Sequence, residues 1–253
     1  GVRERMINFY KEHYVSSKIN VVTVSSLDNS TVKEYIEKSF SNIPTNIKDK
    51  IQIEKPFFEK KGKEYFLKNI SKDNNIIYLW EIPDHVTNYL TSHSPHIISH
   101  VISSDNDKSL KQILIKKGLI KGLYSYVADE GLFYLSIKLS NFENWRDVDS
   151  YVRFYINNLK KYNWQEIVEY YKKKDELIFN YSSKDDSNDL GIKLATNLIY
   201  YPIEKSYIGP NVIETIQISE ITSLLSDYLR FENVNVILTS NKDSSELGDN
   251  ITV

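Results

Sequence analysis

The sequence predicts an α+β fold, with a largely antiparallel sheet packed against helices. Residues 133–139 alternate apolar and polar side chains with a period of two, which is typical of a strand buried on one face. Residues 148–159 instead repeat apolar side chains at helical spacing, and a second helical stripe covers 164–178. Because strands pair locally and helices follow in runs, the order favours an α+β fold over a parallel α/β fold.

The first part of the chain is predicted to be a helix, a short strand and a second helix. Aromatic and apolar residues recur among charges over 3–17, and Val21, Val22 and Val24 then suggest a strand. Ser26 or Asp28 can cap the helix that follows, whose apolar stripe ends near residue 40.

A polar, lysine-rich stretch over 46–63 lacks any sustained periodicity and is predicted to be a linker. The predicted linker separates residues 1–45 from a domain over 64–253. Two apolar runs, 65–70 and 76–82, open the second domain and are predicted to pair as strands across a polar turn. The other elements predicted there are helices over 83–101, 108–117, 190–199 and 221–229, and strands over 122–127 and 234–238.

The composition excludes several classes of function. Lys and Arg number 32 against 34 Asp and Glu, a balance that argues against a general nucleic-acid binder. The absence of Cys rules out disulfides, thiolate metal sites and cysteine nucleophiles. No run is apolar enough for a membrane span and none resembles a signal peptide, so we expect a soluble chain with no membrane partner.

Three histidines suggest a possible metal site. His96 and His100 lie four residues apart on one helix face, and His93 precedes them by one turn. This spacing can hold zinc, but the residues between His96 and His100 include no glutamate to activate a bound water. An independent metal-binding module using these histidines stays open beside the simpler interpretation that they are packing residues.

No other pattern of catalytic residues stands out. The sequence has no G-x-S-x-G motif for a nucleophilic serine and no glycine-rich phosphate loop. Its acidic pairs and lysine runs fall in segments where solvation explains them. The residues by themselves therefore indicate an α+β module without a catalytic centre of its own.

Four segments, in order, resemble the insulinase (insulin-degrading enzyme, pitrilysin) family of inverzincin zinc peptidases. The first is FYKEHYVSSKINVVTV from Phe9, with the helix after it; the second combines LWEIP from Leu79 with KSLKQILIKKGLIKGLYSY from Lys108. The third is GLFYLSIKLS from Gly131, and the last pairs IYYPIEKSYIGP with LRFENVNVILTS. Together they cover almost the whole chain.

The resemblance implies a role without catalysis. The family's zinc motif, H-x-x-E-H, lies in its first domain and is absent from this sequence. The chain would be a fragment holding the end of that domain and the second domain, which forms part of the chamber wall around peptide substrates. Zinc is then expected in the parent protein and not in this fragment, whose partners would be peptide substrates and the remaining domains.

The resemblance also implies an exosite that holds a peptide by adding it as a strand. The sequence departs from the family pattern there: Ser104 replaces a histidine, the expected glycines are absent, and two tyrosines flank Ser125. The residues at the matching positions are Ser103, Ser104, Asp105, Asn106, Ser109, Leu123, Tyr124, Ser125 and Tyr126. The alternative within the same fold is a structural or processing-peptidase-like core subunit that binds partners without catalysis.

Overall fold

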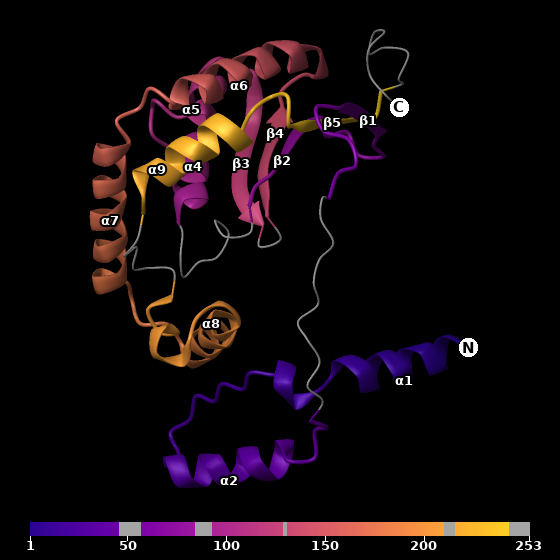
Figure 1. Cartoon of the computed structure of the whole chain (residues 1–253), viewed down its shortest axis with the longest axis vertical. Coiled ribbons are helices and arrows are strands. Elements are labelled where there is room, and N and C mark those ends of the chain that lie inside the picture. The colour runs from indigo at the N-terminus through magenta and orange to yellow at the C-terminus, as the bar shows by residue number, and fades with distance from the viewer. Residues whose placement is uncertain (46–56, 84–92, 129–130, 210–215, 243–253) are drawn as a thin grey trace. The chain divides into compact units, whose positions relative to one another are not determined.

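A computed structural model describes the chain in five stretches, and elements are labelled as in Figure 1. The described residues are 1–45, 57–83, 93–128, 131–209 and 216–242.

The chain divides into two compact units. Unit 1 combines Gly1–Ile53 with Ile178–Asn211, and unit 2 combines Glu54–Leu177 with Val212–Val253. Residues 46–56 of the predicted linker lie outside the described residues, whereas the Lys63 N–H donates to Asn235 Oδ1 at 3.1 Å, within unit 2. The assignment of 1–45 and 64–253 to two domains of a larger protein stays a prediction.

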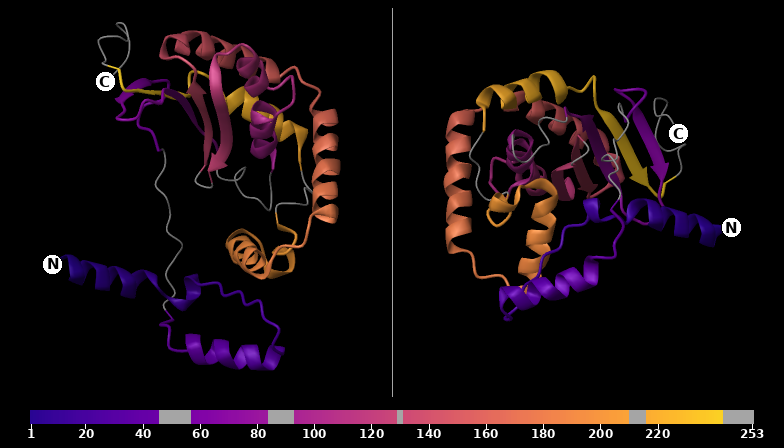
Figure 2. Two further views of the ribbon diagram at one scale, coloured as in Figure 1. Left: turned by 180° about the vertical axis from the view of Figure 1, so that it is seen from behind. Right: turned by 60° about the horizontal axis from the view of Figure 1, so that its bottom comes forward.

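Unit 2 contains a five-stranded sheet in the order β1-β5-β2-β4-β3. Only the β1–β5 pair is parallel, and the other pairs are antiparallel, which confirms the predicted α+β fold with a largely antiparallel sheet. Figures 1 and 2 show β1 and β3 at opposite edges of the sheet. The strands are β1 (Glu64–Lys68), β2 (Asn75–Glu81), β3 (Ile120–Ala128), β4 (Leu132–Leu139) and β5 (Asn235–Ser240).

The predicted pairing of the runs 65–70 and 76–82 is wrong. β1 and β2 both form, but β5 lies between them, so that Leu238 is opposite Phe66 on one side and Ile76 on the other. Leu238 is fully buried, and inserting β5 places its apolar side chains in the core. A polar turn signals a change of direction but does not determine which strand becomes the neighbour.

The strand predicted at Val21, Val22 and Val24 is also wrong, because residues 19–25 form no strand in the described part of the chain. Val21 and Val24 are both exposed, so the short valine run has no buried face to stabilise strand pairing.

The helices agree closely with the predicted segments. Asp28 caps α2 by accepting a hydrogen bond from the Thr31 N–H at 3.0 Å. Gly118, with φ of +69°, follows the end of α5 at the predicted position. The predicted helix over 83–101 is described only from α4 onward, since residues 84–92 lie outside the described residues. The α-helices are α1 (Val2–His13), α2 (Asn29–Phe40), α4 (Ser94–Ser103), α5 (Leu110–Lys116), α6 (Trp145–Leu159), α7 (Trp164–Tyr181), α8 (Ser187–Tyr200) and α9 (Ile218–Ser223), the last continued by a π-helical turn (Leu224–Tyr228).

An aromatic cluster around Trp80 lies in the core of unit 2. The Trp80 ring is fully buried, stacks on Tyr78 at 5.8 Å and meets Phe133 edge-on at 6.0 Å. Its indole Nε1–H donates to the Arg230 carbonyl at 3.0 Å, so the polar atom is satisfied as well. This cluster joins β2 and β4 to the chain that enters β5.

Two glycines with positive φ allow a prediction that separates backbone strain from crowding. A Cβ at Gly62 (φ +71°) would lie 2.7 Å from the backbone oxygen of Glu232, whereas a Cβ at Gly118 (φ +69°) would have no atom within 4 Å. We expect Gly118→Ala to cost about 1–2 kcal/mol for the left-handed conformation. Gly62→Ala is expected to cost about 1–3 kcal/mol more, because a backbone atom must move. Urea denaturation followed by tryptophan fluorescence measures both, and equal losses would contradict the predicted crowding at Gly62.

Candidate functional site

Among the described residues, the strand β3 is an edge of the sheet and pairs with β4 on one side only. The Gly131 N–H donates to the Ala128 carbonyl at 3.0 Å in the turn toward β4, so the Ala128 carbonyl points to the β4 side. Successive residues of a strand direct their backbone groups to opposite sides. Tyr126 and Tyr124 therefore direct theirs toward β4, while Val127, Ser125 and Leu123 direct theirs to the open edge.

The side chains of successive β3 residues likewise point to alternate faces of the sheet. Tyr124 and Tyr126 are 69% and 50% exposed, whereas Leu123 and Val127 are buried on the helix-covered face. Ser125 is half-buried, and its hydroxyl oxygen has no hydrogen-bond partner among the described residues. In the described part of the chain, no other strand pairs with the outer backbone groups of β3, which lie next to a face that carries two large rings.

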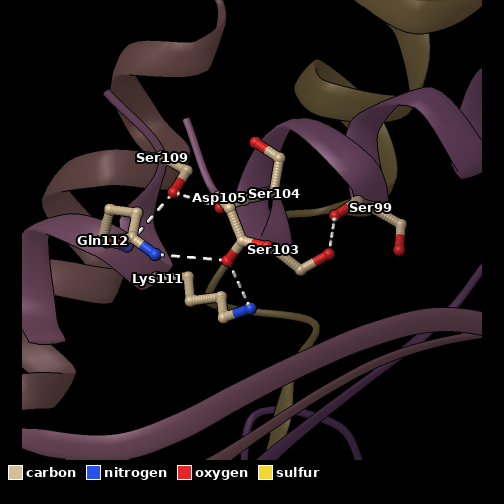
Figure 3. Close-up of polar contacts among 7 residues, drawn as sticks. All are labelled: Ser99, Ser103, Ser104, Asp105, Ser109, Lys111 and Gln112. Carbon is tan, nitrogen blue, oxygen red and sulfur yellow. Dashed lines mark hydrogen bonds and ion pairs between the residues drawn. The ribbon is translucent and has the colours of Figure 1, made fainter. Parts of the chain in front are cut away.

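The second predicted segment is the loop between α4 and α5, two helices that both pack on β3. Figure 3 shows that its polar side chains bond to backbone groups of the loop and to residues of α5, and that Ser103 at the end of α4 bonds to Ser99. The Ser109 hydroxyl donates to the Ser104 carbonyl at 2.6 Å and accepts from the Gln112 N–H at 3.1 Å, which caps α5. The Ser103 hydroxyl donates to the Ser99 carbonyl at 2.9 Å. These serines therefore hold the loop in shape.

The acidic residues of this loop are paired with lysines. Asp105 Oδ1 accepts from Lys111 Nζ at 2.7 Å and from Gln112 Nε2 at 3.2 Å. Lys116 Nζ contacts Asp107 Oδ1 at 2.9 Å. The lysine beside each carboxylate lowers the pKa of Asp105 and of Asp107. The two carboxylates are therefore ionised, and the lysines beside them largely cancel their charge. The loop does not offer unpaired carboxylates to the amino group of a peptide.

Sequence reasoning missed a cavity of about 630 Å³ behind the loop. The Tyr155 hydroxyl donates to the Lys108 carbonyl at 3.2 Å, and burial raises the pKa of Tyr171 to about 12. Each tyrosine lies on a segment predicted to be helical or next to one, so no sequence signal distinguished a cavity wall from a core stripe. The polar and aromatic residues that line the cavity include Ser104, Asn106, Ser109, Tyr155, Tyr162, Tyr170 and Tyr171.

The three histidines do not combine into a metal site in the described part of the chain, where no group of three potential ligands comes together. His93 and His96 have ring centroids 6.3 Å apart, while His100 packs edge-on against Tyr171 at 4.7 Å. Burial, and then the nearby Lys174, lower the pKa of His100. With Lys174 Nζ 3.4 Å from His100 Nε2, a cation bound there would be repelled.

Comparison with known proteins identifies the family. The family model described as the peptidase M16 inactive domain matches residues 2–174. The chain belongs to this family. The predicted kinship with the insulinase and pitrilysin peptidases is therefore confirmed, in its non-catalytic domain.

Three relatives illustrate the likeness of this M16 chain. A protein described as nardilysin-like, from Arabidopsis thaliana, is 24% identical over 259 residues, which cover 97% of this chain and 25% of that protein. The crystal structure of pitrilysin superposes with a TM-score of 0.68 and 18% identity, covering 86% of this chain and 24% of that one. A peptidase M16 inactive domain from Pseudomonas fluorescens superposes with a TM-score of 0.61 and 14% identity, covering 86% of this chain and 52% of that one.

The M16 chain thus spans about a quarter of the length of its curated relative. Within the described residues, no helix combines the length and the apolar character that crossing a bilayer requires. The exosite residues predicted from the resemblance lie in two places, the strand β3 and the segment that joins α4 to α5, two helices that pack on β3. Their binding role stays a prediction.

Proposed function

We propose that this M16 inactive-domain chain forms a peptide-holding part of the substrate chamber of a larger insulinase-type zinc peptidase. In this proposal, the zinc site and its chemistry belong to the parent protein, and this chain contributes binding only. The observation that carries the proposal is the β3 edge, where the backbone groups of Leu123, Ser125 and Val127 face away from the sheet.

Strand addition explains how such an edge binds different peptides. Backbone hydrogen bonds give affinity that does not depend on peptide sequence, and side-chain contacts then modulate it. The α4–α5 loop connects two helices that pack on β3, and the bonds of Ser109 to the Ser104 carbonyl and of Asp105 to Lys111 stabilise its path.

The alternative of a structural or processing-peptidase-like core subunit rests on the same fold and has no site-level observation in its favour. The alternative of an independent metal module is disfavoured by the contact between Lys174 and His100. The family model that matches this chain describes the inactive domain of M16 peptidases, which also gives no support to an independent metal module.

Titration of the full 253-residue chain with fluorescently labelled extended peptides tests the proposal. We expect saturable binding that is the same with EDTA and with added zinc, and no cleavage of the peptide. Binding that requires zinc, or zinc-dependent cleavage by this chain alone, would overturn the assignment of a metal-independent holding role. Absence of binding to every peptide would favour the structural alternative.

A further inference from the structure

We infer that Tyr124 and Tyr126 set the specificity of the β3 edge, selecting extended peptides that carry aromatic residues at two alternate positions. This inference rests on the proposed function, because it concerns the side chains of a peptide added to that edge. Alternate positions matter because residues two apart in a strand lie on the same face.

The direction of the backbone groups determines how closely the side chains approach. Tyr124 and Tyr126 point their N–H and C=O groups toward β4, as the turn bond between Gly131 and Ala128 implies. Toward an antiparallel peptide on the other side, both therefore occupy non-hydrogen-bonded positions. Side chains are closest at such positions, with Cβ atoms about 4.5–5.5 Å apart.

The two rings are suited to meet aromatic partners. Tyr126 stacks on Tyr134 of β4, with ring centroids 4.6 Å apart and planes inclined by 28°. The stack orders the Tyr126 ring before any ligand arrives, which reduces the entropy lost on binding. One aromatic residue of the peptide would extend the Tyr134–Tyr126 stack across the edge. The second aromatic residue of the peptide would contact Tyr124, which is 69% exposed.

The opposite face of β3 offers no comparable contact. Leu123 and Val127 are buried there and Ser125 is small, so peptide side chains pointing to that face find no exposed ring on the strand. The asymmetry predicts that a peptide is recognised by one of its two faces. Two aromatic residues on that face should strengthen binding, and one on each face should do so less.

A pair of peptides with the same composition tests the inference on the full chain. Both have about eight residues, enough to span the strand. The first carries two Phe residues separated by one Thr, and the second carries them separated by two Thr, which places them on opposite faces. We expect the first to bind about 1.4- to 5-fold more tightly, the range for the one additional cross-strand aromatic pair that it forms.

Variants then assign the preference to the two tyrosines. The double variant Tyr124→Thr/Tyr126→Thr keeps β-branched residues on the strand and should remove the difference between the peptides. The matched control is Leu67→Thr on β1, at the other edge of the sheet and 55% exposed, which should keep the difference.

The possible outcomes separate the two proposals. Equal binding of both peptides to the unaltered chain would overturn the specificity and leave strand addition standing. A preference that survives in the double variant would also overturn it. If neither peptide binds, both the specificity and the proposed function fail.

Discussion

Replacement of Trp80 by Ala is expected to cost unit 2 about 3–5 kcal/mol of unfolding free energy. The change removes a fully buried ring that contacts Tyr78, Phe133 and Phe231, and it leaves the Arg230 carbonyl without its indole donor. Since whole domains are stable by about 5–15 kcal/mol, the loss should appear as a large fall in the urea midpoint.

Circular dichroism measures this effect without depending on the deleted fluorophore. The control is Leu67→Ala, an exposed position on β1, where we expect a change within about 0.5 kcal/mol. Similar losses for both variants would mean that the Trp80 cluster is not the main stabilising centre of the sheet.

Replacement of Ser125 by Pro is expected to weaken peptide binding at least about 10-fold. The substitution removes a backbone N–H that faces the open edge and fills its position with the proline ring. The β3–β4 hydrogen bonds should persist, because the N–H groups that face β4 belong to Tyr124 and Tyr126. Proline is tolerated on edge strands for this reason, so the chain should remain folded.

The Ser125→Ala variant separates the side chain from the backbone. Its N–H is retained, and the hydroxyl that it removes has no hydrogen-bond partner among the described residues. We therefore expect affinity within about 2-fold of the unaltered chain. Loss of binding in Ser125→Ala, or unchanged binding in a folded Ser125→Pro chain, would contradict backbone recognition.

Local signals predicted most of the elements. The strand over 133–139 and the helix over 148–159 have long, regular periods, and the structure places β4 and α6 there. The helix ends at Asp28 and Gly118 were also predictable, because each depends on residues only a few positions away in the sequence.

Contacts between distant segments were not predictable in the same way. The insertion of β5 between β1 and β2 depends on pairing across more than half of the chain, which no turn residue encodes. The cavity has the same origin, because Tyr155 lies on α6 whereas Tyr170 and Tyr171 lie on α7. The residue types on each helix indicated burial, but only their packing brings them together.

The candidate site was accessible from the sequence only through a family resemblance. The sequence predicted a strand over 122–127, where β3 lies, but nothing in its residues showed that it would be an edge. The pairing of Asp105 with Lys111 was likewise hidden, because it depends on the path of the loop between two helices. The exposure of Tyr124 and Tyr126 follows from their face of β3, since Leu123 and Val127 on the helix-covered face are buried.

Amide hydrogen exchange resolved by residue tests the central claim most directly, since it reports which backbone groups a peptide engages. With a saturating extended peptide, the account predicts slower exchange at Leu123, Ser125 and Val127, whose N–H groups face the open edge. Tyr124 and Tyr126, which face β4, should change little. Bound peptide without this alternating protection of β3 would contradict strand addition at this edge.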